Sequence, residues 1–143
     1  MVLVALSATG AAAKSSAKKL RINCSATAYN VDYPKLSGLA FGQLKCTKPF
    51  GAGVQQARNT TTIVGSTVHV SGSFKNFFDD GTTSGTVKMS GPLGQGTLTV
   101  KGSATITGGT GAYKHMKGTG PVSCTTIDNG KTFHCVVKGT ATA

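Results

Sequence analysis

Acidic residues are scarce in this sequence. Asp and Glu together number four against 15 Lys and Arg, so the formal net charge is +11 at pH 7. A surface of this sign attracts polyanions and anionic membranes at low salt. Arginine, the residue best suited to bidentate contacts with phosphates and bases, occurs only at Arg21 and Arg58. Because the lysines are also dispersed, we expect a solvated basic exterior and no sequence-specific nucleic-acid binding.

Helical periodicity is also nearly missing. Glu is absent, whereas Gly contributes 20 of the 143 residues and Thr and Ser are abundant. This composition favours short strands joined by glycine turns. A chain of this length forms one domain that buries roughly two thirds of its unfolded surface. We therefore predict an all-β fold around a single core.

Motifs for metal binding or hydrolysis are missing from the sequence. No Cys-x-x-Cys pair occurs, and His69, His115 and His134 make no recognisable ligand set. No Ser, His and Asp set can be assembled from the sequence, so hydrolase catalysis has no support. We expect no metal site.

The apolar stretch of residues 2–13 is too short to cross a bilayer as a helix, so we expect no transmembrane segment. It ends in small residues and precedes a polar, lysine-rich run, which resembles a secretory signal peptide without the basic region in front. A flexible cytosolic tail is the alternative interpretation. We expect cleavage near Ala13, a disordered basic lead-in to residue 19, and a domain over residues 20–143 of a secreted protein.

An alternating stretch from Thr97 to Ile106 shows the clearest strand pattern. Apolar or small residues at even positions alternate with Thr, Lys and Ser at odd positions, which is typical of a half-buried strand. The following residues 107–111, Thr-Gly-Gly-Thr-Gly, supply the positive-φ positions of a reversal. A second polar-apolar run, Tyr113 to Thr119, then predicts the returning strand of a hairpin.

Similar patterns predict about eight strands in meander order. Residues 48–58 are interpreted as a loop, and residues 92–96 as a turn. An antiparallel sheet of this size closes into a barrel, whose interior is either filled by side chains or holds one small ligand. The remaining predicted strands are 20–30, 39–47, 59–64, 67–78, 84–91, 122–127 and 132–141.

The four cysteines predict two structural disulfides. Asn129-Gly130 indicates a two-residue hairpin turn, and counting outward from it places Cys124 opposite Cys135. A softer turn centred near Lys35 places Cys24 opposite Cys46 in the same way. Both bridges imply an oxidising compartment.

The segment Ile106-Thr-Gly-Gly-Thr-Gly-Ala-Tyr-Lys-His-Met-Lys-Gly118 resembles the glycine-rich hairpin of dirigent proteins and the related allene oxide cyclase barrel. The preceding residues 78–91 resemble, more loosely, the strand that leads into it. The resemblance covers roughly residues 65–121. It implies an eight-stranded barrel, often a trimer, with a pocket for a hydrophobic small molecule and no metal or organic cofactor.

The resemblance has two departures that concern chemistry. Ala112 stands where an acid can follow the Gly-Gly-Thr-Gly pattern, and Lys117 stands where the family has an arginine. Without the acid, a general acid or base is missing from its expected place. Whether the barrel steers the cyclisation or coupling of its ligand is therefore left open.

Tyr113, His115 and Lys117 alternate along the predicted returning strand and would share one of its faces. If that face is inward, they form a polar patch that orients a phenol or a carboxylate in an apolar pocket. If it is outward, Tyr113 packs while His115 and Lys117 are solvated. Both interpretations stay open, and all three residues are candidate ligand contacts.

Three further residues are candidate ligand contacts. Asp79 and Asp80 could lie at a pocket rim, although Asp-Asp-Gly is also good turn chemistry. Phe74 falls on the predicted inward face of its strand. Separately, Asn23 and Asn59 each begin an Asn-x-Ser/Thr sequence that fits the N-glycosylation pattern, which often arises by chance.

Two classes of function follow from the sequence. The first is a secreted barrel that binds a small hydrophobic molecule, as the resemblance implies. The second is a secreted, non-catalytic binding module whose basic exterior engages anionic cell-surface polymer or lipid. A hollow interior would favour the first class.

Overall fold

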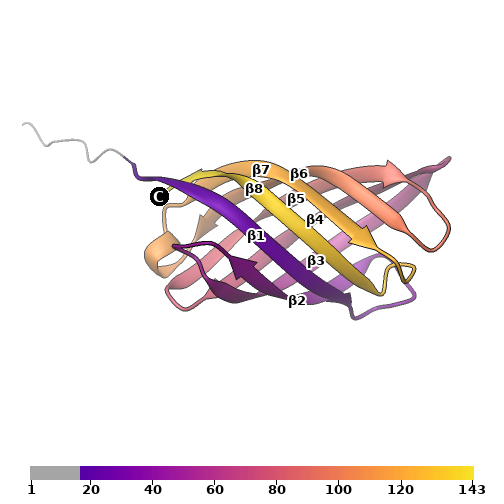
Figure 1. Cartoon of the computed structure of the whole chain (residues 1–143), viewed down its shortest axis with the longest axis horizontal. Coiled ribbons are helices and arrows are strands. Elements are labelled where there is room, and N and C mark those ends of the chain that lie inside the picture. Colours follow the sequence, from indigo (N-terminus) through magenta and orange to yellow (C-terminus); the bar gives the residue numbers. More distant parts are fainter. Residues whose placement is uncertain (1–16) are drawn as a thin grey trace, which may run out of the picture.

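The computed structural model describes residues 17–143, and its strands form a closed antiparallel barrel (Figure 1). Each strand pairs with the next along the chain, and β8 pairs with β1 to close the sheet. This confirms the predicted all-β meander barrel. The elements are β1 Lys19–Asn30, β2 Gly38–Cys46, β3 Ala52–Val64, β4 Thr67–Phe78, β5 Gly81–Pro92, β6 Leu98–Gly109, the 3₁₀ helix η1 Gly111–Tyr113, β7 Lys117–Thr126 and β8 Thr132–Thr142.

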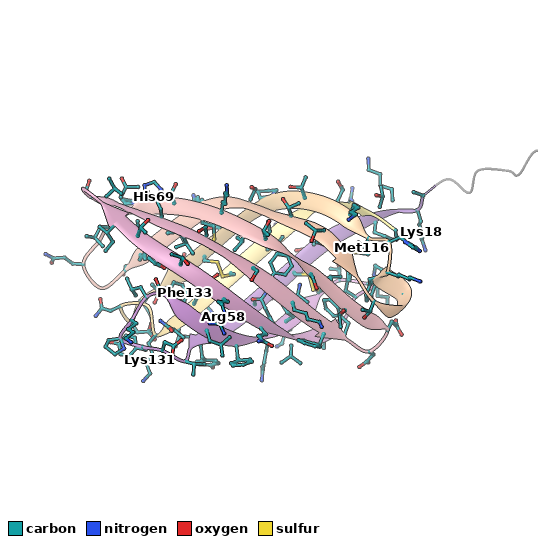
Figure 2. The ribbon with its side chains drawn as sticks, turned by 180° about the vertical axis from the view of Figure 1, so that it is seen from behind. Lys18, Arg58, His69, Met116, Lys131 and Phe133 are labelled. Atoms are coloured by element: carbon teal, nitrogen blue, oxygen red, sulfur yellow. A yellow bond between two sulfur atoms is a disulfide. The ribbon has the colours of Figure 1, made fainter. Side chains whose placement is uncertain are left out.

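Closure of the barrel leaves two ends with different connections. The loops between β2 and β3, β4 and β5, and β6 and β7 lie at the η1 end, near the carboxyl terminus (Figure 1). The loops between β1 and β2, β3 and β4, β5 and β6, and β7 and β8 lie at the opposite end, called here the β1–β2 end. Figure 2 shows Met116 beside η1 and Phe133 towards the β1–β2 end. No helix in residues 17–143 has the length and apolar character needed to cross a bilayer.

Side chains alternate between the interior and the exterior of the barrel. On β6 the predicted parity holds: Val100 is buried and Ile106 is half-buried, whereas Lys101 and Thr105 are exposed. Val68 on β4, two strands away, is fully buried in the same hydrophobic cluster as Val100. Apolar even positions of β6 therefore contribute to the core, as alternation in a half-buried strand requires.

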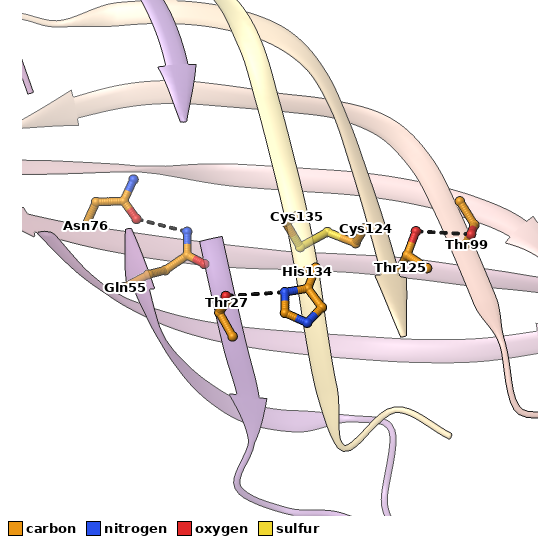
Figure 3. Close-up of a disulfide and its surroundings, with 8 residues drawn as sticks. All are labelled: Thr27, Gln55, Asn76, Thr99, Cys124, Thr125, His134 and Cys135. Atoms are coloured by element: carbon orange, nitrogen blue, oxygen red, sulfur yellow. Dashed lines mark hydrogen bonds between the residues drawn. A yellow bond between two sulfur atoms is a disulfide. The ribbon is translucent and has the colours of Figure 1, made fainter. Parts of the chain in front are cut away.

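Both predicted disulfides are present. Cys24 faces Cys46 across β1 and β2, and Cys124 faces Cys135 across β7 and β8 (Figure 3). The second pairing follows from the turn, in which Asn129 and Gly130 both have positive φ, 56° and 91°.

Asp128 stabilises the same turn through its carboxylate. The Thr132 N–H and the Thr126 hydroxyl each donate a hydrogen bond to the carboxylate, both at 2.8 Å. Hydrogen bonds to the ionised form lower the pKa of Asp128 from 3.8 to about 2, with the Thr132 N–H as the larger cause. The turn that sets the cysteine register is thus held by a charged side chain.

Two predicted elements were wrong. The segment predicted as a loop at residues 48–58 belongs mostly to β3, which starts at Ala52. The inward positions of β3 include the polar residues Gln55 and Asn59, so the strand shows no apolar alternation in the sequence. The returning strand was also misplaced: β7 begins at Lys117 and continues to Thr126, and Tyr113 lies in η1 before it.

The loop at η1 forms because it binds the neighbouring β4–β5 turn. The Ala112 N–H donates to the Asp80 carbonyl, and the Thr110 hydroxyl contacts that of Thr82 at 2.8 Å. Gly111 adopts φ 59°, and a side chain there would collide with the Asp80 backbone. These contacts turn the chain inward at the point where a tight hairpin was expected.

Candidate ligand site inside the barrel

The interior of the barrel contains a cavity of about 150 Å³. Inward side chains from all eight strands line it, and most of them are apolar. The apolar members include Ala26, Ala57, Phe74, Val87, Met89 and Val122. The lining side chains all belong to residues 17–143, and none of them carries a charge.

Amide side chains interrupt this apolar lining on β3 and β4. The Gln55 side-chain amide donates to Asn76 Oδ1 at 2.9 Å (Figure 3). The Asn76 amide in turn donates to Thr83 Oγ1 at 3.2 Å. Thr83 is almost fully buried. Gln55 thus has a hydrogen-bond partner in Asn76, and Asn76 has another in Thr83, as buried polar groups require.

Asn59 is the exception among these amides. It lies on β3 four residues after Gln55, and its Oδ1 is buried without a hydrogen-bond partner. Its cross-strand neighbours are Gly38 on β2 and Gly72 on β4, so neither carries a side chain that could reach the amide. A side chain at position 72 would collide with Asn59 Oδ1. Among residues 17–143, Asn59 Oδ1 is thus a buried polar side-chain atom that lies over Gly72 in the cavity wall and is left unpaired.

Aromatic side chains pack together in the core at the η1 end of the barrel. Phe50 stacks on Tyr113 with ring centroids 5.2 Å apart, and Phe78 packs against both rings. Ile22 and Met116 belong to the same buried cluster. We call these five residues the aromatic plug. Burial, with Asp80 and then Asp79 as weaker causes, raises the pKa of Tyr113 above its usual value of 10.0.

A short loop, residues 31–37, covers the β1–β2 end. Leu36 from this loop lines the cavity and packs over Gly130. The Thr61 hydroxyl donates to the Leu36 carbonyl at 2.9 Å, and Ser37 Oγ accepts from the Thr61 N–H at 2.9 Å and donates to the Thr61 carbonyl. The Asn30 side chain donates to the Lys35 carbonyl at 2.6 Å. Hydrogen bonds from β1 and β3 thus hold the loop across this end.

The sequence-predicted site residues do not gather in one place. Phe74 lines the cavity, as its parity indicated. Tyr113 is buried in the aromatic plug, whereas His115 is exposed in the loop after η1. Lys117 is exposed on β7, and its ammonium donates to the Thr107 carbonyl.

Of the two interpretations of Tyr113, His115 and Lys117, the inward polar patch is therefore wrong; as in the other interpretation, Tyr113 packs while His115 and Lys117 are exposed. The three residues cannot share a strand face, because the chain forms η1 and a turn before β7 begins. Asp79 and Asp80 are exposed in the tight turn between β4 and β5, the alternative that turn chemistry indicated. Neither aspartate lines the cavity.

The interior amides are not recognisable from the pattern of the sequence. Gln55, Asn59 and Asn76 were not proposed as ligand contacts, because hydrophobic alternation identifies inward positions only when they are apolar. One signal was present. The odd positions 59 and 61 of β3 face inward, and positions 55 and 57 continue the same alternation into the segment predicted as a loop. The glycosylation pattern at Asn59 also falls on an inward side chain, whereas Asn23 is exposed.

Within residues 17–143, no group of three His, Cys, Asp or Glu side chains lies close enough together to hold a metal ion. Compared with known proteins, the sequence matches no family model and no curated protein sequence. The likeness to dirigent proteins and allene oxide cyclase thus remains a hypothesis based on one hairpin segment.

Proposed function

We propose that this protein is a secreted binding protein that takes one compact, largely apolar small molecule into the barrel. The observation that supports the proposal is the cavity of about 150 Å³ with its largely apolar lining, which includes Ile22 of the aromatic plug and Leu36 of loop 31–37. Apolar cavities of about this size in other proteins stay dry and bind a single aromatic ring. The dimensions favour a ligand of one ring.

The lining favours binding over catalysis. Its polar side chains are amides and hydroxyls, which orient a ligand through hydrogen bonds. General acid–base catalysis by a side chain needs a titratable group within reach of the ligand. The side chains that line the cavity, all from the described residues, include none that titrates near neutral pH. If the barrel steers a reaction of its ligand, the lining side chains do so by positioning the ligand and not by protonating it.

The two disulfides are compatible with the proposed extracellular location. Disulfides persist in oxidising compartments, so both bridges are compatible with an extracellular protein. The proposed signal segment at residues 2–13 lies outside the described residues.

Calorimetric titration with toluene tests the proposal. Toluene should bind the wild-type protein with one site and raise its melting temperature, because a ligand that binds only the folded state stabilises it. Ala57→Leu places a larger side chain in the cavity and should abolish binding. Lys117→Ala, on the exterior, should bind as the wild type does.

A second filling variant, Ala26→Leu on β1, serves if Ala57→Leu does not fold. No heat and no melting shift for toluene or for p-cresol with the wild-type protein would refute the proposal. Equal binding by the wild type and a folded filling variant would refute it as well, since the ligand would then sit elsewhere.

A further inference from the structure

We infer that the ligand of the cavity is an uncharged molecule with a hydroxyl group, and that this hydroxyl hydrogen-bonds to the side-chain amide of Asn59. The inference rests on the proposed function, since it presumes that the cavity holds a ligand. It adds the chemical class of the ligand and the residue that recognises it.

Asn59 Oδ1 is a buried side-chain oxygen that the protein leaves without a hydrogen-bond partner. A buried polar atom without a partner costs free energy, and such atoms are rare in folded proteins. Gln55 and Asn76 show that the same strands can pair their interior amides, at 2.9 Å. Asn59 Oδ1 has no such partner, and glycines flank it on both neighbouring strands. Asn59 lines the cavity, and its Oδ1 is buried over Gly72, so the amide turns towards the cavity when a ligand hydroxyl supplies the missing hydrogen bond.

The lining also determines the charge of that group. Burying an ionised carboxylate or ammonium without a counter-charge is far more costly than burying a neutral hydroxyl. No charged side chain lines the cavity within the described part of the chain, and the lysines and arginines there are exposed. An acid or an amine is therefore a poor ligand. A hydroxyl both donates and accepts, so it can bond to either end of an amide.

The position of Asn59 places the polar end of the ligand. Asn59 pairs with Gly38, the first residue of β2, directly after loop 31–37. Ala57 and Phe74 face one another one step nearer the η1 end. The hydroxyl would thus lie towards loop 31–37, and the ring would lie deeper, against Ala57 and Phe74.

Four probes of one ring test the inference by calorimetry: toluene, p-cresol, benzoate and benzylamine. p-Cresol should bind the wild type more tightly than toluene, and benzoate and benzylamine should bind at least tenfold more weakly than p-cresol. Asn59→Leu, nearly the same size, should lower the ratio of p-cresol to toluene affinity by about tenfold, as expected for one lost hydrogen bond. Asn23→Leu, the same substitution on the exterior of β1, should leave that ratio unchanged.

A second measurement separates ligand recognition from a structural role. If Asn59 serves the ligand, the empty Asn59→Leu protein should melt at the same or a higher temperature than the wild type, because an unpaired buried polar group is removed. A lower melting temperature would mean that Asn59 supports the fold, and would overturn its assigned role. Asn59→Ala gives the affinity ratio if the leucine variant does not fold.

The outcomes also separate this inference from the proposed function. If toluene and p-cresol bind alike, or if Asn59→Leu keeps the preference for p-cresol, the inference is wrong and the cavity remains a ligand site. Tight binding of benzoate or benzylamine would overturn the uncharged class in the same way. If neither toluene nor p-cresol binds the wild type, the proposed function itself fails.

Discussion

Tyr113 shows how one side chain changes its role when the chain turns inward. Its ring is 3% exposed and stacks on Phe50 at the η1 end of the barrel. Burial and the nearby Asp80 and Asp79 carboxylates all disfavour the phenolate. A tyrosine that a hairpin pattern suggested as a ligand contact thus acts as a packing residue whose hydroxyl stays protonated.

The raised pKa of Tyr113 predicts instability at alkaline pH. The folded state holds the phenolic proton more tightly than the unfolded state, whose tyrosine ionises near its ordinary value of 10.0. The unfolding free energy should therefore fall as pH rises above about 10. Tyr113→Phe keeps the ring and removes the proton, so its decline should be shallower. Parallel urea titrations from pH 8 to 11 measure the difference, and identical pH profiles would contradict it.

Loop 31–37 lies at the β1–β2 end of the barrel, where its Leu36 side chain lines the cavity. Three hydrogen bonds join the loop to Thr61 on β3, one at Leu36 and two at Ser37. Short surface loops held by few bonds open at lower free energy than the strands around them. A ligand that enters at this end would pass when the loop opens.

Removing the Ser37 hydroxyl should speed ligand exchange. Ser37→Ala deletes two of the three hydrogen bonds, while Ser37 does not line the cavity. Association and dissociation of toluene should both accelerate several-fold with little change in Kd, since the bound contacts remain. Stopped-flow or relaxation measurements give both rates. Ser73→Ala on the exterior of β4 is the matched control, and unchanged rates in Ser37→Ala would exclude this route.

The whole molecule combines a neutral interior with a basic exterior. Every lysine and arginine in residues 17–143 is exposed, and they occur on strands and loops around the barrel. Their distribution matches the dispersed charge expected from the sequence. Such a surface supports weak, non-specific attraction of polyanions, the second class of function that the sequence left open.

Binding to heparin should therefore depend steeply on salt and on no single lysine. Lys45→Gln on β2 and Lys101→Gln on β6 should each weaken binding slightly and equally, because each removes one screened charge. Elution from a heparin column at increasing NaCl measures both variants. A large loss in one variant alone, or retention at high salt, would indicate a localised site.

The sequence by itself determined the architecture where local rules apply. Alternation revealed the inward face of β6, and the Asn129-Gly130 turn set the register that joins Cys124 to Cys135. Strand parity also placed Phe74 in the interior. These predictions succeeded because side-chain period and turn geometry depend on residues that are close along the chain.

Only the tertiary structure decided where the candidate ligand site lies. The inward Gln55 is polar, so residues 48–58 were predicted as a loop, although β3 begins at Ala52. Tyr113 turned inward because η1 binds the β4–β5 turn, some thirty residues earlier in the chain. The volume of the cavity depends on how side chains from eight strands fill a closed barrel. Whether Asn59 finds a hydrogen-bond partner depends on which strands lie beside it. Volume and hydrogen-bond satisfaction are properties of the assembled barrel, so a pattern read along one strand cannot predict them.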